Sequence, residues 1–123
     1  MAINSQKIGY VLQSFVTTTG DVQGAALVTP DGLPLASSLP SGMDDERVSA
    51  MSAAMLSLGE RIGKELARGD IDRIYVEGTE GFSILTKCDE EAVFIVLASK
   101  AAKQGVSMLE IKRTVAELKL LLL

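Results

Sequence analysis

The residues best suited to chemistry in this sequence are two clusters of carboxylates. They occur at residues 44–46 (DDE) and 89–91 (DEE), and neighbouring carboxylates can act as a general acid/base pair. Both clusters fall where a helix start and a turn are expected, so capping and turn formation account for them better than catalysis. The sequence has no histidine, which removes the usual general base and the commonest metal ligand. We predict no catalytic residue and no metal or cofactor site.

Two other features resemble reactive motifs without meeting their requirements. The stretch GERIGK at residues 59–64 has three residues between its glycines, where a P-loop has four. Glu65 replaces the Ser or Thr of that motif, and the stretch lies inside a predicted helix. Cys88 is the only cysteine, so an internal disulfide is excluded, and we expect a small, half-buried apolar side chain rather than a redox sensor. These features predict a protein that is not an enzyme.

Composition excludes further classes of function. The 123 residues are 47% hydrophobic and 23% charged, as in one globular domain spanning residues 1–123. The net charge of −4, without a basic arm, argues against nucleic-acid binding. The longest apolar run inside the domain, residues 92–98, is too short to insert across a membrane. The N-terminus lacks a signal-peptide pattern, and with a single cysteine this favours the cytoplasm.

Hydrophobic periodicity predicts the order helix, strand, strand, helix, three strands, helix. Short connections make the sheet an antiparallel one of five strands, and the helices can cover both of its faces, so the fold class is α+β. Pro34 places its strand at one edge, the mixed pattern of IDRIYVE places residues 71–77 at the other, and the doubly apolar EAVFIVLA belongs in the centre. The expected helices cover residues 5–19, 44–68 and the stretch after Gly105. Turn residues 30–32 (PDG) join the first two strands.

The long helix carries two adjacent stripes. An apolar stripe, the expected core face, contains Val48, Met51, Met55, Leu58, Ile62 and Leu66. The second stripe consists of three small residues and one leucine, Ser52, Leu56, Gly59 and Gly63, and it would let a second copy of the helix approach closely. The alternative is that the glycines make room for a bulky side chain of the same domain. With the exposed edge strand, the predicted dimer interface consists of Ser52, Leu56, Gly59, Gly63, Ile71, Arg73 and Tyr75.

The C-terminal leucines at residues 118–123 point all round a helix, so at least one should remain outside the core. They are either a contact for a partner or a tail that folds over the dimer or frays.

The chain resembles the Roadblock family of dynein light chains and its prokaryotic, MglB-like members. The resemblance is carried by VQGAALVTPDGLPLASS after a short helix, by the long second helix, and by IYVEGTEGFSILTKCDEEAVFIVLA as three consecutive strands. It implies a Roadblock/profilin-like fold. It also implies a homodimer in which the edge strands join two sheets and the long helices lie antiparallel.

The resemblance further implies that the paired helices form a platform for a small Ras-like GTPase or for a larger scaffold. The candidate partner-binding residues are Arg47, Ala50, Ser57, Arg61, Lys64 and Arg68. The first hypothesis is a homodimeric regulator of the GTPase nucleotide cycle, in which Arg61 or Arg47 could act as an arginine finger. The alternatives are a passive scaffold subunit and a small-ligand-sensing module with a cavity between sheet and helices.

Overall fold

The elements of the chain follow the predicted order in the computed structural model, which describes residues 4–102 and 108–122. They are α1 (Ser5–Thr18), β1 (Val22–Val28), β2 (Pro34–Ser38), α2 (Asp45–Glu65), β3 (Arg73–Gly78), β4 (Gly81–Asp89), β5 (Ala92–Ser99) and α3 (Met108–Leu121). The predicted α+β fold is confirmed. The last helix is predicted to begin after Gly105; residues 103–107 lie outside the described residues, and the described helix begins at Met108.

The five strands form one antiparallel sheet in the order β2-β1-β5-β4-β3. Both predicted edges and the central position of β5 are therefore confirmed. The turn between β1 and β2 forms as the PDG sequence predicts: the Gly32 N–H donates to the Thr29 carbonyl oxygen at 3.0 Å. Gly32 has a φ of +97°, a conformation that glycine adopts without steric cost.

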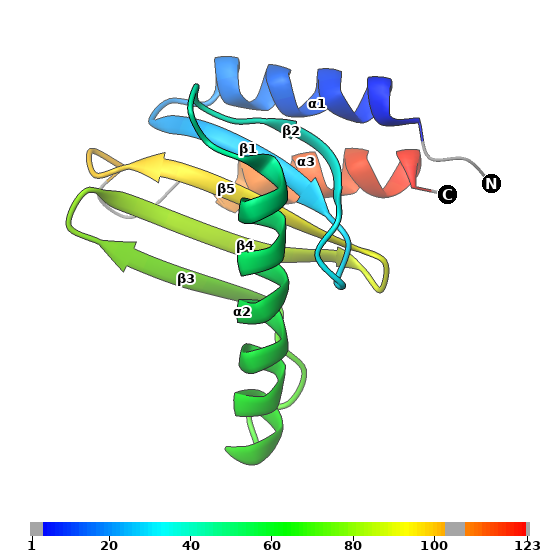
Figure 1. Ribbon diagram of the computed structural model, residues 1–123, viewed down its shortest axis with the longest axis vertical. Helices are drawn as coiled ribbons and strands as arrows, with labels where there is room; N and C mark the ends of the chain where they lie inside the picture. The colour runs from blue at the N-terminus through cyan, green and yellow to red at the C-terminus, as the bar shows by residue number, and fades with distance from the viewer. Residues whose placement is uncertain (1–3, 103–107, 123) are drawn as a thin grey trace.

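Helices cover both faces of the sheet, with α1 and α3 on one side and α2 on the other (Figure 1). The larger core lies under α1 and α3, where the rings of Phe15 and Phe94 pack edge to face at 5.3 Å. The smaller core lies under α2, where Leu56 packs with Val93 and Ile95. Because α2 shares so small a core, much of its surface remains exposed.

Helix α2 begins as predicted and ends earlier than predicted. The Asp44 carboxylate accepts the Glu46 N–H at 3.0 Å and so caps the first turn. The helix ends at Glu65 rather than at Arg68, because Ala67 takes a left-handed φ of +56° and the Arg68 N–H turns back to the Gly63 carbonyl oxygen at 2.7 Å. Figure 1 shows α2 crossing the sheet and extending past β3.

The two stripes of α2 have exchanged the positions predicted for them: the small-residue stripe faces the sheet, and the larger apolar stripe faces outward. Ser52, Leu56 and Gly63 are buried against the sheet, whereas the predicted core stripe is largely exposed; its exposed members are Met51, Met55, Leu58, Ile62 and Leu66. Only Val48 of that stripe is half-buried. The prediction that the larger apolar stripe is the core face of the protomer is therefore wrong.

The glycines explain this orientation of α2. A Cβ atom at Gly59 would lie 2.6 Å from Cδ1 of Ile74, and one at Gly63 would lie 2.5 Å from the carbonyl oxygen of Gly69. The glycines thus make room for the same domain, which was the alternative interpretation. The assignment of this stripe to a dimer face is therefore corrected. Its residues form a face that packs inside the protomer: Ser52, Leu56, Gly59 and Gly63.

Candidate protein-interaction surface

The exposed side chains Met51, Met55, Leu58, Ile62 and Leu66 form a continuous strip along α2, here named the apolar stripe. Each is between 37% and 62% exposed. Beside the stripe lies a groove of about 340 Å³ between α2 and the sheet, lined by Met51, Met55, Val76, Leu85 and Leu97 among others. An apolar surface that continues from a helix into a groove is typical of a protein-interaction site.

Strand β3 borders the same groove and forms an edge of the sheet. Its side chains alternate as predicted: Val76 lines the groove beside α2, whereas Tyr75 points toward α3 and donates its hydroxyl to Met108 Sδ at 3.3 Å. Within the described residues, the outer backbone edge of β3 pairs with no other strand. Ile71, predicted for the dimer interface, precedes the strand, and its Cδ1 lies against the Gly63 position. Arg73 and Tyr75 lie on the free edge itself.

The side of α2 that points away from the sheet, here named the outer face, contains five of the six predicted partner-binding residues, and Arg68 follows the end of the helix. All of them are exposed: Arg47, Ala50, Ser57, Arg61, Lys64 and Arg68. Arg61 Nε lies 3.2 Å from Glu65 Oε1, and Arg68 Nε donates to the Leu66 carbonyl oxygen at 2.9 Å. The outer face therefore combines cationic and small side chains on an accessible helix, and it adjoins the apolar stripe without sharing a residue with it.

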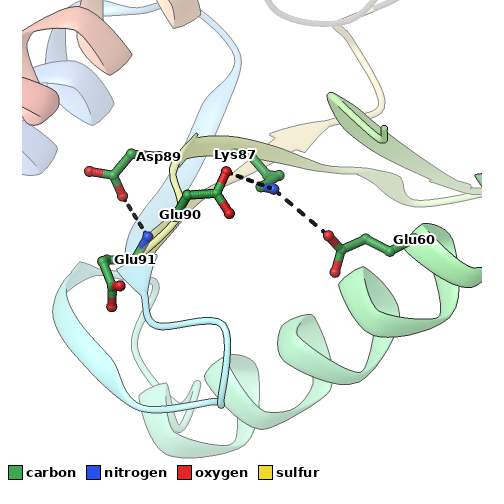
Figure 2. Close-up of polar contacts among 5 residues, drawn as sticks. All are labelled: Glu60, Lys87, Asp89, Glu90 and Glu91. Carbon is green, nitrogen blue, oxygen red and sulfur yellow. Dashed lines mark hydrogen bonds and ion pairs between the residues drawn. The ribbon is translucent and has the colours of Figure 1, made fainter. Parts of the chain in front are cut away.

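The acidic clusters have structural roles, as the sequence predicted for them. Figure 2 shows Lys87 between α2 and the β4–β5 turn, with Nζ at 3.7 Å from Glu60 Oε2 and 3.8 Å from Glu90 Oε1. In the same turn the Glu91 N–H donates to Asp89 Oδ1 at 2.8 Å. Among the described residues, no three His, Cys, Asp or Glu side chains gather in a group that could hold a metal ion.

The C-terminal leucines divide between the core and the surface, as their arrangement around a helix requires. Leu118 is fully buried, whereas Leu120 is 71% exposed; Leu123 lies outside the described residues. In the described part of the chain no helix combines the length and the apolar character needed to cross a membrane.

Cys88 is a free thiol buried in the core beneath α3, more deeply than the half-buried position predicted. Burial, with a smaller contribution from the Asp89 carboxylate, raises the pKa of its thiol to about 12 from 9.0, and the Lys119 ammonium opposes this shift. The thiol therefore remains protonated in the folded chain at neutral pH and is a poor nucleophile.

The raised pKa of Cys88 predicts a loss of stability at alkaline pH. The protonated thiol contributes fully to the free energy of unfolding below pH 9. This contribution decreases as the pH rises from 9 toward 12, because the thiol ionises at lower pH in the unfolded chain than in the folded chain. Between pH 8 and pH 10.5 we expect the free energy of unfolding to fall by about 2 kcal/mol more in the native chain than in Cys88→Ala. Urea unfolding of both proteins at both pH values measures this difference, and parallel losses would contradict a buried, protonated thiol.

Comparisons with known proteins agree with this architecture. A family model described as "Roadblock/LC7 domain" matches residues 9–98. The chain is 30% identical over 101 residues to the protein MJ1340 of Methanocaldococcus jannaschii, whose name describes it as uncharacterized, and the match covers 82% of this chain and 88% of that protein.

Solved structures show the same fold at low sequence identity. MglB of Myxococcus xanthus is 17% identical, with a TM-score of 0.85 and coverage of 99% of this chain and 92% of that chain. A Roadblock/LC7 domain from Streptomyces avermitilis is 20% identical, with a TM-score of 0.81 and coverage of 93% and 96%. Profilin IA of Acanthamoeba castellanii is 16% identical, with a TM-score of 0.64 and coverage of 90% and 95%, which confirms the expected profilin-like architecture.

Proposed function

This chain belongs to the Roadblock/LC7 family, and from that premise we propose that it is a homodimeric, non-enzymatic regulator of a small Ras-like GTPase in the cytoplasm. The observation that carries the proposal is that α2 has two exposed faces of different chemistry. One face is apolar and suits a second copy of the chain. The other is polar and cationic and suits a different protein.

The apolar stripe and the groove beside it support the homodimer. In a two-fold arrangement the same surface is used by both copies, so the stripe of each α2 can enter the groove of its partner. The free β3 edge borders this groove and can pair with the partner's β3, which would join the two sheets. This proposal keeps Arg73 and Tyr75 at the interface and replaces the small-residue stripe with Met51, Met55, Leu58, Ile62 and Leu66.

The outer face supports a second, different partner. With two α2 helices side by side, the outer faces of both copies form one platform carrying Arg47, Arg61 and Lys64. The similarity to MglB-like proteins favours a Ras-like GTPase as the occupant. The switch loops of a Ras-like GTPase have two arrangements, and the regulator would stabilise one of them by contacting that arrangement more strongly.

Binding to the Ras-like GTPases of the source genome, loaded separately with GDP or with a GTP analogue, tests this function. We expect tighter binding of the GTP form and a changed rate of hydrolysis. Equal affinity for both forms would favour a passive scaffold, and no binding to any of these GTPases would contradict the proposed partner.

Substitution of Arg61 tests the outer face. We expect Arg61→Ala to weaken binding of the GTP-loaded partner about tenfold, since arginines in the centre of an interface often contribute more than 1 kcal/mol. Arg113→Ala on α3 is the matched control, because Arg113 is similarly exposed and also paired with a glutamate, Glu110. A fall of about a thousandfold in stimulated hydrolysis with unchanged binding would identify Arg61 as an arginine finger. Equal effects of both substitutions would contradict the assignment of the outer face.

A further inference from the structure

A second cavity lies on the opposite side of the sheet from α2, between the start of β3 and helix α3. Its volume is about 300 Å³, and Arg73, Thr86, Ile111, Lys112, Val115 and Lys119 are among the residues that line it. This volume is at the lower end of the range for small-molecule sites. The cavity shares no lining residue with the apolar groove beside α2.

Two of the residues that line this cavity each carry a buried polar atom with no hydrogen-bond partner among the described residues. These atoms are Nε of Arg73 and Oγ1 of Thr86, and Thr86 is only 7% exposed. Arg73 and Thr86 are directly opposite each other in the β3–β4 ladder, so their side chains project from neighbouring positions on one face. A buried donor without a partner costs about 1–3 kcal/mol. An unpartnered guanidinium N–H and an unpartnered hydroxyl on opposed residues can both donate to an acceptor that enters the cavity.

The charges around the cavity favour an anionic acceptor. Lys112 and Lys119 from α3 line it together with Arg73, and Asp72 carries the only carboxylate among the described residues of the lining. Asp72 Oδ2 lies 3.5 Å from Nη2 of Arg73, whereas Nε has no hydrogen-bond partner among the described residues. Lys87 also contributes to the lining, but its ammonium pairs with Glu60 and Glu90. With Lys87 paired elsewhere, the described lining thus holds three further cations and one carboxylate.

We propose that the β3–α3 cavity binds a small phosphate ester. The phosphate oxygens accept hydrogen bonds from Arg73 Nε and Thr86 Oγ1, while the ammonium groups of Lys112 and Lys119 supply the remaining positive charge. Ile111 and Val115 line the same cavity and provide an apolar wall for the ester's organic part. The proposal does not depend on the GTPase partner, because the residues that would hold the phosphate lie on the opposite side of the sheet from the outer face of α2.

Phenyl phosphate is a suitable probe, since it joins a phosphate to a small apolar ring. We expect saturable binding by calorimetry, at least tenfold weaker binding of inorganic phosphate, and no binding of phenol. In a ¹H–¹⁵N NMR titration, the Nε–H signal of Arg73 and the amide signal of Thr86 should shift together. Uniform small shifts without saturation, or equal binding of phenol, would overturn the proposal.

Matched substitutions locate the site. Thr86→Val and Lys112→Gln should each weaken phenyl phosphate binding about tenfold, and Thr86→Val should fold normally because it removes only an unpaired hydroxyl. The controls are Thr114→Val, at a threonine equally buried on α3, and Arg113→Gln, at an exposed cation of the same helix. Both controls should remain within twofold of the native affinity, and equal losses in controls and test variants would overturn the assignment.

A phosphate ester can also be part of a lipid headgroup. Cosedimentation with phosphatidic acid vesicles, in the presence and absence of phenyl phosphate, distinguishes the two sources. We expect no vesicle binding. Vesicle binding that phenyl phosphate does not displace, together with no binding of phenyl phosphate alone, would overturn the assignment of a small ligand.

Discussion

Replacing Met55 and Ile62 together by glutamate should convert a dimer into a monomer that keeps its fold. Both side chains belong to the apolar stripe and are 37% and 48% exposed in the single chain, so the carboxylates can reach water there. In the proposed dimer they would be enclosed by the partner's groove. An unpaired charge buried in this way costs about 3 kcal/mol or more, which corresponds to a rise of at least about a hundredfold in the dimer Kd.

Sedimentation velocity across a range of concentrations measures this change, and circular dichroism reports whether the fold is kept. Ala54→Glu with Ser57→Glu is the matched control. It adds the same charge to exposed positions of the same helix on the outer face, so it should leave the dimer intact. A monomeric native chain would contradict the homodimer. A dimer that survives the substitution of Met55 and Ile62 would show that another surface is used.

The reversal of the two α2 stripes shows what periodicity can and cannot predict. The spacing correctly indicated which residues share a face, because the helix repeat fixes this geometry. It did not indicate which face points inward, since an apolar stripe can be covered by the chain's own sheet or by another molecule. Met51 and Leu58 are more than half exposed in the protomer, whereas Ser52 is buried. Helix α2 packs closely on the sheet, and small side chains such as that of Ser52 fit this contact better than the larger side chains of the apolar stripe.

The sheet was more predictable than the helix surface because its signals are local. Pro34 lacks an N–H donor, and residues 71–77 mix apolar and charged side chains, so both edges could be assigned from the sequence. The exposed outer face also followed from the helix repeat. The β3–α3 cavity was not foreseen, because Arg73 and Thr86 become neighbours only through the register of β3 on β4. The early end of α2 depends on the left-handed conformation of Ala67, which alanine seldom adopts.

The close packing of α2 leads to an expected result that runs against helix propensity. Alanine is about 1 kcal/mol better than glycine inside a helix, yet Gly63→Ala should destabilise the protein by about 1–3 kcal/mol, as overpacking does. The added Cβ would lie 2.5 Å from the Gly69 carbonyl oxygen and 2.8 Å from Cδ1 of Ile71. The first of these atoms is backbone, so the obstacle cannot be relieved by rotating a side chain. Gly9→Ala is the control, because Gly9 lies in α1 and a Cβ there meets nothing within 4 Å.

A substitution at Gly59 can show whether a steric contact is what disfavours alanine in α2. The atom that a Cβ at Gly59 would meet belongs to a side chain, so it can be removed by a second substitution. The added Cβ would lie 2.6 Å from Cδ1 of Ile74, and Ile74→Val removes that atom. Gly59→Ala should therefore stabilise the Ile74→Val protein by about 1 kcal/mol, the gain from helix propensity, and should stabilise the native chain less or destabilise it. Urea unfolding of the four proteins in this double-mutant cycle gives the coupling energy. A coupling of zero would mean that Gly59 does not pack against Ile74, and the orientation of α2 on the sheet would have to be revised.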